Sequence, residues 1–186
     1  GSDVSFSAPQ DYNGSETFTV SVTDGTDTDS QSITVTVNAV NDAPVLSSIG
    51  NQQLLEDESL TILLSAFDVE GDNLSFSIQG GTNITSSISG VELVFNPIQN
   101  YFGSEQFTII VTDGDLEDSE TFTVVVDSVN DAPVLATVSN VSFDEDTAGS
   151  TSLSGNDVDG DDLEFSISGG SDIVATLNGS DVSFSA

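Results

Sequence analysis

The sequence predicts an all-β fold of tandem seven-stranded Greek-key β-sandwiches that follow one another in a rod. Two observations predict it. Hydrophobic residues alternate with polar ones along most of the chain, and the whole pattern returns at a fixed interval. Alternation with a period of two is typical of half-buried strands, and no stretch shows the 3.6-residue period of an amphipathic helix.

The repeat has a period of 89 residues. Residues 40–46 (VNDAPVL) recur unchanged as residues 129–135, which is an offset of 89. The same offset relates residues 68–72 (DVEGD) to residues 157–161 (DVDGD). The octapeptide GSDVSFSA at residues 1–8 returns at residues 179–186, two periods later. A constant offset at so many positions indicates tandem structural repeats.

Two prolines mark the expected boundaries between repeats. Pro44 and Pro133 follow strand-like runs, and proline cannot donate a ladder hydrogen bond. We therefore place the boundaries near residues 46 and 135. Residues 47–135 then form one complete repeat, residues 1–46 the C-terminal half of the repeat before it, and residues 136–186 the N-terminal half of the next. Half a sandwich exposes its inner face, so a longer array or a neighbouring chain is expected to complete each half.

Within residues 47–135, the alternation predicts about seven short antiparallel strands. Two of them are expected near residues 53–55 and 84–88. The inward residues of the other five are Leu60, Ile62 and Leu64; Leu74, Phe76 and Ile78; Leu93 and Phe95; Phe107, Ile109 and Val111; and Phe122, Val124 and Val126. Gly80-Gly81 and Asp113-Gly114 supply turns between them. Such strands are typical of a sandwich whose core is filled by interdigitating Phe and Ile side chains.

The composition excludes several classes of function. The chain has 32 Asp and Glu and no Lys, Arg or His, which gives a formal charge of −32. Such a charge repels nucleic acid and anionic membranes, and no apolar run is long enough for membrane insertion. A serine nucleophile would lack its usual base, so an enzyme is not expected.

Three acidic elements recur where loops of adjacent repeats are expected to converge. They are the linker, the turn after the second strand and the turn after the penultimate strand. The linker contributes Asn38, Asn41 and Asp42, and one period later Asp127, Asn130 and Asp131. The turn after the second strand contributes Asp68, Glu70 and Asp72, and one period later Asp157, Asp159 and Asp161. The turn after the penultimate strand contributes Asp24, and one period later Asp113. Clustered carboxylates repel one another unless a cation binds, and Ca²⁺ takes six to eight oxygen ligands.

Some of these acids have a simpler interpretation. Asp24 and Asp113 each precede a glycine, and Asp-Gly equally favours a tight turn. Gly71 and Gly160 come fourth in their acidic loops, where an EF-hand needs glycine sixth. The remaining acids near the hairpins are expected to be solvated and to maintain solubility: Asp27, Asp29, Asp115, Glu117, Asp118 and Glu120.

The acidic motifs resemble those of cadherin repeats. Residues 127–133 (DSVNDAP) are similar to the cadherin linker, residues 66–70 (AFDVE) to its Ala-x-Asp-x-Asp element, and residues 111–114 (VTDG) to its Ala-x-Asp-x-Gly element. The VNDAP ending and residues 100–107 (NYFGSEQF) more closely resemble the bacterial cadherin-like, Ig-like tandem repeats of large RTX-type surface adhesins.

The resemblance implies Ca²⁺ between consecutive repeats, with one or two ions per junction. At the first junction it implies the ligands Asn38, Asn41, Asp42, Asp68, Glu70 and Asp113. At the second it implies Asp127, Asn130, Asp131, Asp157 and Asp159. Glu16, Glu56 and Glu105 are further candidates from the preceding repeat. Asn38 departs from the pattern, because it stands where the linker has Asp.

The function expected from these features is a calcium-rigidified spacer of a bacterial cell-surface or secreted adhesin or fibre, located outside the cell. Its partners would be adjacent repeats or neighbouring copies. The alternative is a carbohydrate-binding or homophilic adhesive module with polysaccharide as a partner. Tyr12 and Tyr101 are the only tyrosines and there is no Trp, so sugar stacking is poorly supplied. A third hypothesis is that residues 136–186 of one copy complete residues 1–46 of another, giving a head-to-tail polymer.

Overall fold

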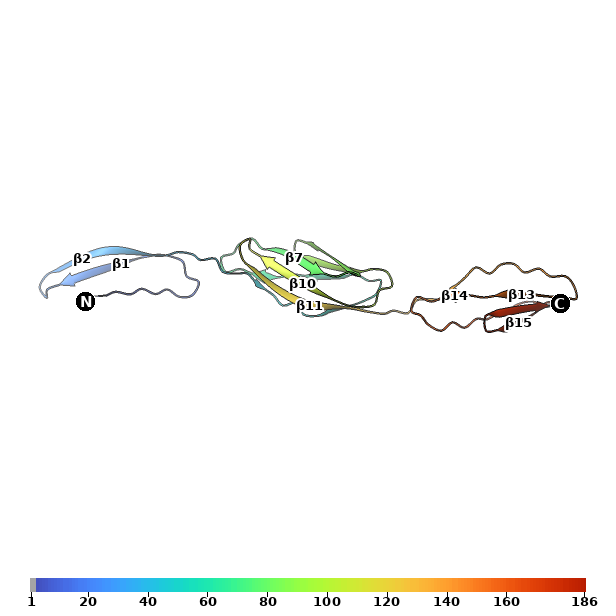
Figure 1. Cartoon of the computed structure of the whole chain (residues 1–186). Helices are drawn as coiled ribbons and strands as arrows, with labels where there is room; N and C mark the ends of the chain where they lie inside the picture. Colours follow the sequence, from blue (N-terminus) through green and yellow to red (C-terminus); the bar gives the residue numbers. More distant parts are fainter. Residues whose placement is uncertain (1–2) are drawn as a thin grey trace.

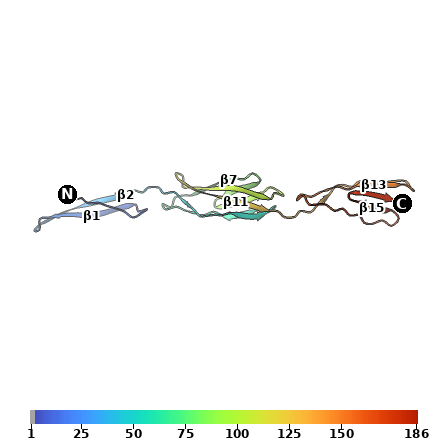
Figure 2. The same ribbon diagram turned by 60° about the horizontal axis from the view of Figure 1, so that its bottom comes forward.

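The protein is a row of three β-units. A computed structural model describes residues 3–186. The central unit is the largest, and the two ends of the chain lie in the outer units, at opposite ends of the row (Figure 1). The view in Figure 2 shows the same elongated arrangement. Over residues 3–186, there is no helix with the length and apolar character needed to cross a membrane. The all-β fold is confirmed.

The central unit is a two-layered sandwich. One sheet has the order β4-β11-β10-β7, the other has the order β5-β9-β8, and β3 pairs with β6 at the edge. The strand bounds are β3 (Val45–Leu46), β4 (Gln52–Leu55), β5 (Leu60–Leu63), β6 (Ala66–Phe67), β7 (Ser75–Gly80), β8 (Ile84–Ser89), β9 (Glu92–Pro97), β10 (Gly103–Thr112) and β11 (Glu117–Asp127). The seven strands predicted from the alternation correspond to β4, β5 and β7 to β11, and the structure adds the two-residue strands β3 and β6.

The direction of one strand differs from the prediction. All pairings in the unit are antiparallel except that of β4 with β11, which is parallel. Both strands run toward the second junction, where the Glu56 amide extends their ladder by donating to the Asp127 carbonyl at 2.9 Å. This parallel pairing places the end of β4 beside the linker that leaves β11.

Aromatic side chains fill the core, as the alternation predicts. Phe95 packs edge-on against Phe107, with ring centroids 5.0 Å apart, and against Phe122 at 6.1 Å. Leu93 and Ile109 are completely buried beside them. Aromatic pairs in this arrangement add to the stabilisation from buried apolar area. These rings therefore hold the two sheets together.

Each outer unit contains only part of this strand set. The N-terminal unit is a hairpin of β1 (Gly14–Thr23) and β2 (Thr28–Val37). The C-terminal unit contains β12 (Val134–Leu135), β13 (Ala148–Ser152), β14 (Gly155–Asn156), β15 (Val174–Asn178) and β16 (Asp181–Ser185). The boundaries near residues 46 and 135 stay predictions. The short strands beside them, β3 and β12, pair with β6 and β14 in the units that follow.

Two acids expected to be solvated instead hold the connection between β3 and β4. The Leu46 amide donates to Asp118 at 2.8 Å, and the amides of Ile49 and Gly50 each donate to Glu120 at 2.9 Å. The bonds from the Gly50 and Ile49 amides hold the pKa of Glu120 below its ordinary value. The solvation prediction was wrong for this pair, because it overlooked unpaired backbone amides 70 and more residues away in sequence. Asp27, Asp29, Asp115 and Glu117 are exposed.

The turn between β7 and β8 yields a test of the packing. Gly81 in this turn and Gly71 in the acidic turn of residues 68–72 both have φ of 77°. A Cβ added at Gly81 would meet the Ile84 carbonyl and lie 2.7 Å from the Phe107 ring. A Cβ added at Gly71 would meet no atom within 4 Å. Gly71→Ala should lower the free energy of unfolding by about 1–2 kcal/mol through backbone strain alone. Gly81→Ala should cost a further 1–3 kcal/mol or so from overpacking. Denaturant melts in chelator measure both, and equal losses would contradict the packing described.

Candidate metal centre

The second junction is where three acidic segments meet. They are the end of β4, the linker after β11 and the turn of residues 157–161. That turn folds around one side chain, because the amides of Asp159 and Asp161 donate to Asp157 Oδ1 at 3.0 and 3.3 Å. Gly160 allows it to close, with φ of 80°. The turn therefore presents several carboxylates on one side.

Glu56 reaches this junction from the sandwich before it. Its side chain is only 3% exposed. Oε1 accepts a hydrogen bond from the Val129 amide at 2.5 Å, and Oε2 is buried without a hydrogen-bond partner. An unpaired buried carboxylate oxygen is costly, so this atom calls for a ligand that the protein chain does not provide.

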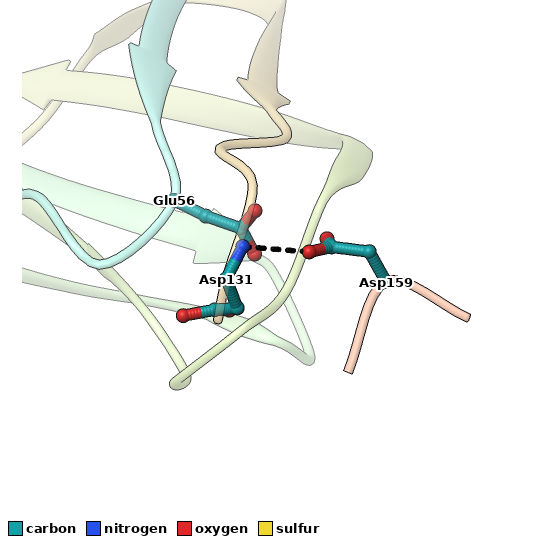
Figure 3. Close-up of side chains that lie close together, drawn as sticks. All are labelled: Glu56, Asp131 and Asp159. Atoms are coloured by element: carbon teal, nitrogen blue, oxygen red, sulfur yellow. Dashed lines mark hydrogen bonds between the residues drawn. The ribbon is translucent and has the colours of Figure 1, made fainter. Parts of the chain in front are cut away.

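Asp131 and Asp159 complete a group of three with Glu56 (Figure 3). The Asp131 amide donates to Asp159 Oδ2 at 2.7 Å, which ties the linker to the following unit. Asp131 Oδ2 is also buried without a partner. One carboxylate oxygen from each of the three residues lies within 4.8 Å of the others. Asp159 also belongs to a second such group with Asp157 and Asp161, so the two groups are continuous.

The electrostatics of the cluster favour a cation. Two carboxylates at 4.8 Å repel by about 3 kcal/mol at an effective dielectric constant near 20. With no Lys, Arg or His in the sequence, no positively charged side chain can offset this repulsion. The available donors are carboxylate, amide and backbone oxygens, which suit a hard cation such as Ca²⁺. Zinc and copper sites normally use His or Cys, and the chain has neither.

The first junction repeats the arrangement with fewer acids. The Asp42 amide donates to Glu70 at 3.3 Å, as the Asp131 amide donates to Asp159 one period later. Asp68 is 6% exposed, and its Oδ2 is buried without a partner. Asn38, Asp42 and Glu70 line one pocket there.

Several predicted ligands have other contacts in the structure. Asp113 Oδ1 closes its own turn by accepting from the Asp115 and Leu116 amides, while its Oδ2 accepts from Asn41 Nδ2 at 2.9 Å. Asp24 closes the equivalent turn in the first hairpin. The turn interpretation therefore accounts for one oxygen of each. At the second junction, Gln53 Nε2 donates to Asp127, and Asn130 Nδ2 donates to the Asp131 carbonyl at 2.8 Å.

Glu105 lies apart from both acidic groups. It accepts from the backbone amides of Thr82, Asn83 and Ile84 at 2.7–3.2 Å, and also from Asn83 Nδ2. Burial alone would raise the pKa of Glu105, but these hydrogen bonds outweigh it and hold the pKa below its ordinary value. Glu16, one period earlier, is exposed and contacts only the Tyr12 hydroxyl, at 3.4 Å, among the described hydrogen bonds.

Comparisons with known proteins agree with this fold. Residues 41–126 match the family model described as bacterial Ig domain. The match covers most of the central unit. A human protocadherin-24 EC1-2 structure is similar, with a TM-score of 0.50 and 20% identity, covering 76% of this chain and 79% of that one.

Other solved structures give lower TM-scores. An endo-fucoidan hydrolase from glycoside hydrolase family 107 gives a TM-score of 0.43 and 18% identity over 95% of this chain. The chain spans 30% of the hydrolase. No curated protein sequence matches the chain. The protocadherin similarity, at 20% identity, shows the fold alone.

The contacts of Glu105 predict an effect on stability that does not involve metal. Glu105→Gln should lower the free energy of unfolding by about 1–2 kcal/mol, because charge-assisted bonds to three amides are weakened at a partly exposed site. Since the pKa of Glu105 is lowered by folding, its contribution is present above the ordinary value of 4.5 and is lost as the pH falls through the folded value. Denaturant melts in chelator from neutral pH to below pH 4 measure this.

Glu16→Gln is the matched control, since it removes the same charge at the equivalent position of the first hairpin. It should leave the unfolding of the central unit unchanged at every pH. A loss for Glu105→Gln that appeared only with Ca²⁺ present would contradict the anchoring role.

Proposed function

We propose that the chain is a spacer of a bacterial surface or secreted adhesin or fibre, and that Ca²⁺ bound at its junctions makes it rigid. The observation that carries this proposal is the buried Glu56 carboxylate. It has one unpartnered oxygen and lies with a carboxylate oxygen within 4.8 Å of those of Asp131 and Asp159, in a sequence without one basic side chain. The bacterial Ig-like match supports the spacer role, since such domains are typically found outside the cell or on its surface.

The ligands come from three segments that must be held together for a junction to be stiff. Glu56 belongs to the central unit, Asp131 to the linker, and Asp159 with Asp157 and Asp161 to the unit that follows. A cation bound by all three would fix the direction in which one unit follows the next. Without it, their mutual repulsion would push the segments apart. Rigidity of the row would therefore depend on the concentration of the ion.

Ca²⁺ fits this donor set better than Mg²⁺. The acidic group combines carboxylates from separate segments, and Ca²⁺ accepts six to eight oxygens in flexible geometry. Mg²⁺ demands a near-ideal octahedron and keeps several waters. A ligand that binds only the folded junction stabilises it by about 2.7 kcal/mol at a hundredfold excess over its Kd.

Glu56→Gln tests the second junction. Gln retains an oxygen that can accept from Val129, but it replaces the unpartnered oxygen with an amide and removes a buried charge. In chelator, the melting temperature of the variant should equal or exceed that of the wild type, because a repulsive charge is gone. With Ca²⁺, the wild type should gain stability and the variant should gain much less, so the order reverses.

Glu92→Gln is the control for that variant, since Glu92 is exposed on β9 and belongs to neither acidic group. It should show the full gain with Ca²⁺. An identical gain for the wild type and Glu56→Gln, together with unchanged small-angle scattering dimensions in chelator and Ca²⁺, would exclude calcium rigidification at this junction.

The two junctions should bind with different affinities. The second junction has Glu56 and two groups of three close carboxylates, whereas the first has no group of this kind among residues 3–186. Calorimetric titration of the full chain should therefore show a tighter and a weaker class of Ca²⁺ site. Glu70→Gln should weaken only the weaker class, and Asp159→Asn only the tighter one. A single class that both variants weaken alike would contradict this assignment.

A further inference from the structure

The segment that enters the central sandwich is joined along its length to the strand that leaves it. Residues 46–56 form the entering segment and residues 118–129 the leaving one, and we call their contact the entry–exit seam. It begins with the bond from the Leu46 amide to Asp118. Its middle is the parallel ladder of β4 with β11, in which four residues of each strand pair. Since β3 pairs with β6 through only two residues of each, most of the strand pairing of the entering segment lies in the seam.

Side-chain oxygens extend the seam from the ladder toward the first junction. Glu120 accepts from the amides of Ile49 and Gly50, each at 2.9 Å. Asn51 Oδ1 accepts from the Thr123 amide, also at 2.9 Å. Hydrogen bonds to an ionised carboxylate are roughly twice as strong as those between neutral groups. The part of the seam that no backbone ladder covers is therefore held by a charged anchor.

The seam also continues past the ladder at the second junction. The Glu56 amide donates to the Asp127 carbonyl at 2.9 Å, and Gln53 Nε2 donates to the Asp127 carboxylate. The Val129 amide donates to Glu56 Oε1 at 2.5 Å, beyond the last residue of β11. Hydrogen bonds thus follow one another from the start of the entering segment to the linker that leaves the sandwich.

The direction of the two segments decides how the seam responds to tension. The neighbouring units lie on opposite sides of the sandwich, so tension along the row enters before β3 and leaves after β11 (Figure 1). It draws the entering segment toward the first junction and the leaving segment toward the second. Because the two segments are parallel, they must slide past each other lengthwise. The bonds of a parallel ladder are evenly spaced between its strands, so sliding loads them together rather than one at a time.

We propose that the entry–exit seam is the load-bearing element of the central unit, which opens under tension along the row only after the seam slips. The order β4-β11-β10-β7 places the other two strands of this sheet beyond β11. Tension that passes from one linker to the other therefore does not have to cross them while the seam holds. This resistance to pulling requires no ion, so it goes beyond the proposed calcium-dependent stiffness of the junctions.

Two carboxylates with similar contacts separate this property from ordinary stability. Glu120 accepts from two backbone amides within the seam. Glu105 accepts from the three backbone amides of residues 82–84, which connect β7 to β8 and lie outside the seam. Losing either carboxylate should destabilise the sandwich at equilibrium. The bonds of Glu120 alone must break before the seam slips, so only their loss should ease opening under tension.

Pulling single molecules of the full chain in two directions, in chelator, tests the load path. Handles attach to introduced cysteines, since the chain has none of its own. Val40→Cys with Val134→Cys, exposed at 78% and 67%, loads the seam lengthwise. Val40→Cys with Asp115→Cys places both handles at the first junction, where Asn41 contacts Asp113, and opens the seam from one end. The lengthwise direction should need about twice the force or more, because several bonds must break together.

The two carboxylate variants are then compared at constant force in the lengthwise direction. Glu120→Gln should unfold about tenfold faster than the parent, because it weakens charged bonds that resist slipping. Glu105→Gln should unfold less than about threefold faster, although denaturant melts show it to be destabilised. Equal acceleration of the two variants, or equal unfolding forces in the two directions, would overturn the proposal.

A second pair of variants repeats the comparison without changing a charge. Gln53→Ala removes the side-chain bond to Asp127 from an exposed position of β4. Gln106→Ala truncates an exposed side chain of β10, outside the seam. Gln53→Ala should unfold about threefold faster in the lengthwise direction, and Gln106→Ala at the rate of the parent. Equal rates for these two variants would also count against the seam as the load-bearing element.

Discussion

The structure depends on how carboxylates are accommodated in a chain without basic side chains. The sequence has 32 acids and no Lys, Arg or His. Each carboxylate must therefore face water, accept hydrogen bonds from amides or bind a cation. Glu105 and Glu120 accept bonds from backbone amides, and the pKa of each is lowered. Glu56, Asp68 and Asp131 each retain a buried oxygen without a partner. Besides the exposed acids, the chain therefore contains acids whose oxygens anchor loop amides and acids that retain a buried, unpartnered oxygen.

Strand periodicity explains why Glu56, Glu105 and Glu120 are directed inward. Glu105 is in phase with Phe107 and Ile109 on β10, and Glu120 is in phase with Phe122 and Val124 on β11. Glu56 continues the inward face of Leu54. Because side chains alternate across a strand, an acid in phase with the core is directed inward, at the end of the sandwich where loops close it. Such an acid meets either loop amides or another acid, and the partner decides its role.

The alternation of side chains along the strands allows part of the fold and of the candidate site to be predicted from the sequence. The strands, the core rings and the convergence of Glu56, Asp131 and Asp159 follow from alternation, period and motif. The anchoring by Asp118 and Glu120 was missed, although their alternation with Phe122 was visible. Their partners are loop amides far away in sequence, and no local pattern identifies those. The parallel pairing of β4 with β11 was also missed, because alternation shows which way side chains face but not which strands become neighbours.

The candidate metal centre follows from the period of the repeat. A junction takes Glu56 from one repeat, Asp131 from the linker and Asp159 from the next repeat, so no single repeat contains the group. Two consecutive units must therefore both be folded before these carboxylates meet. A proposed ion bound by all three would fix the angle between the units.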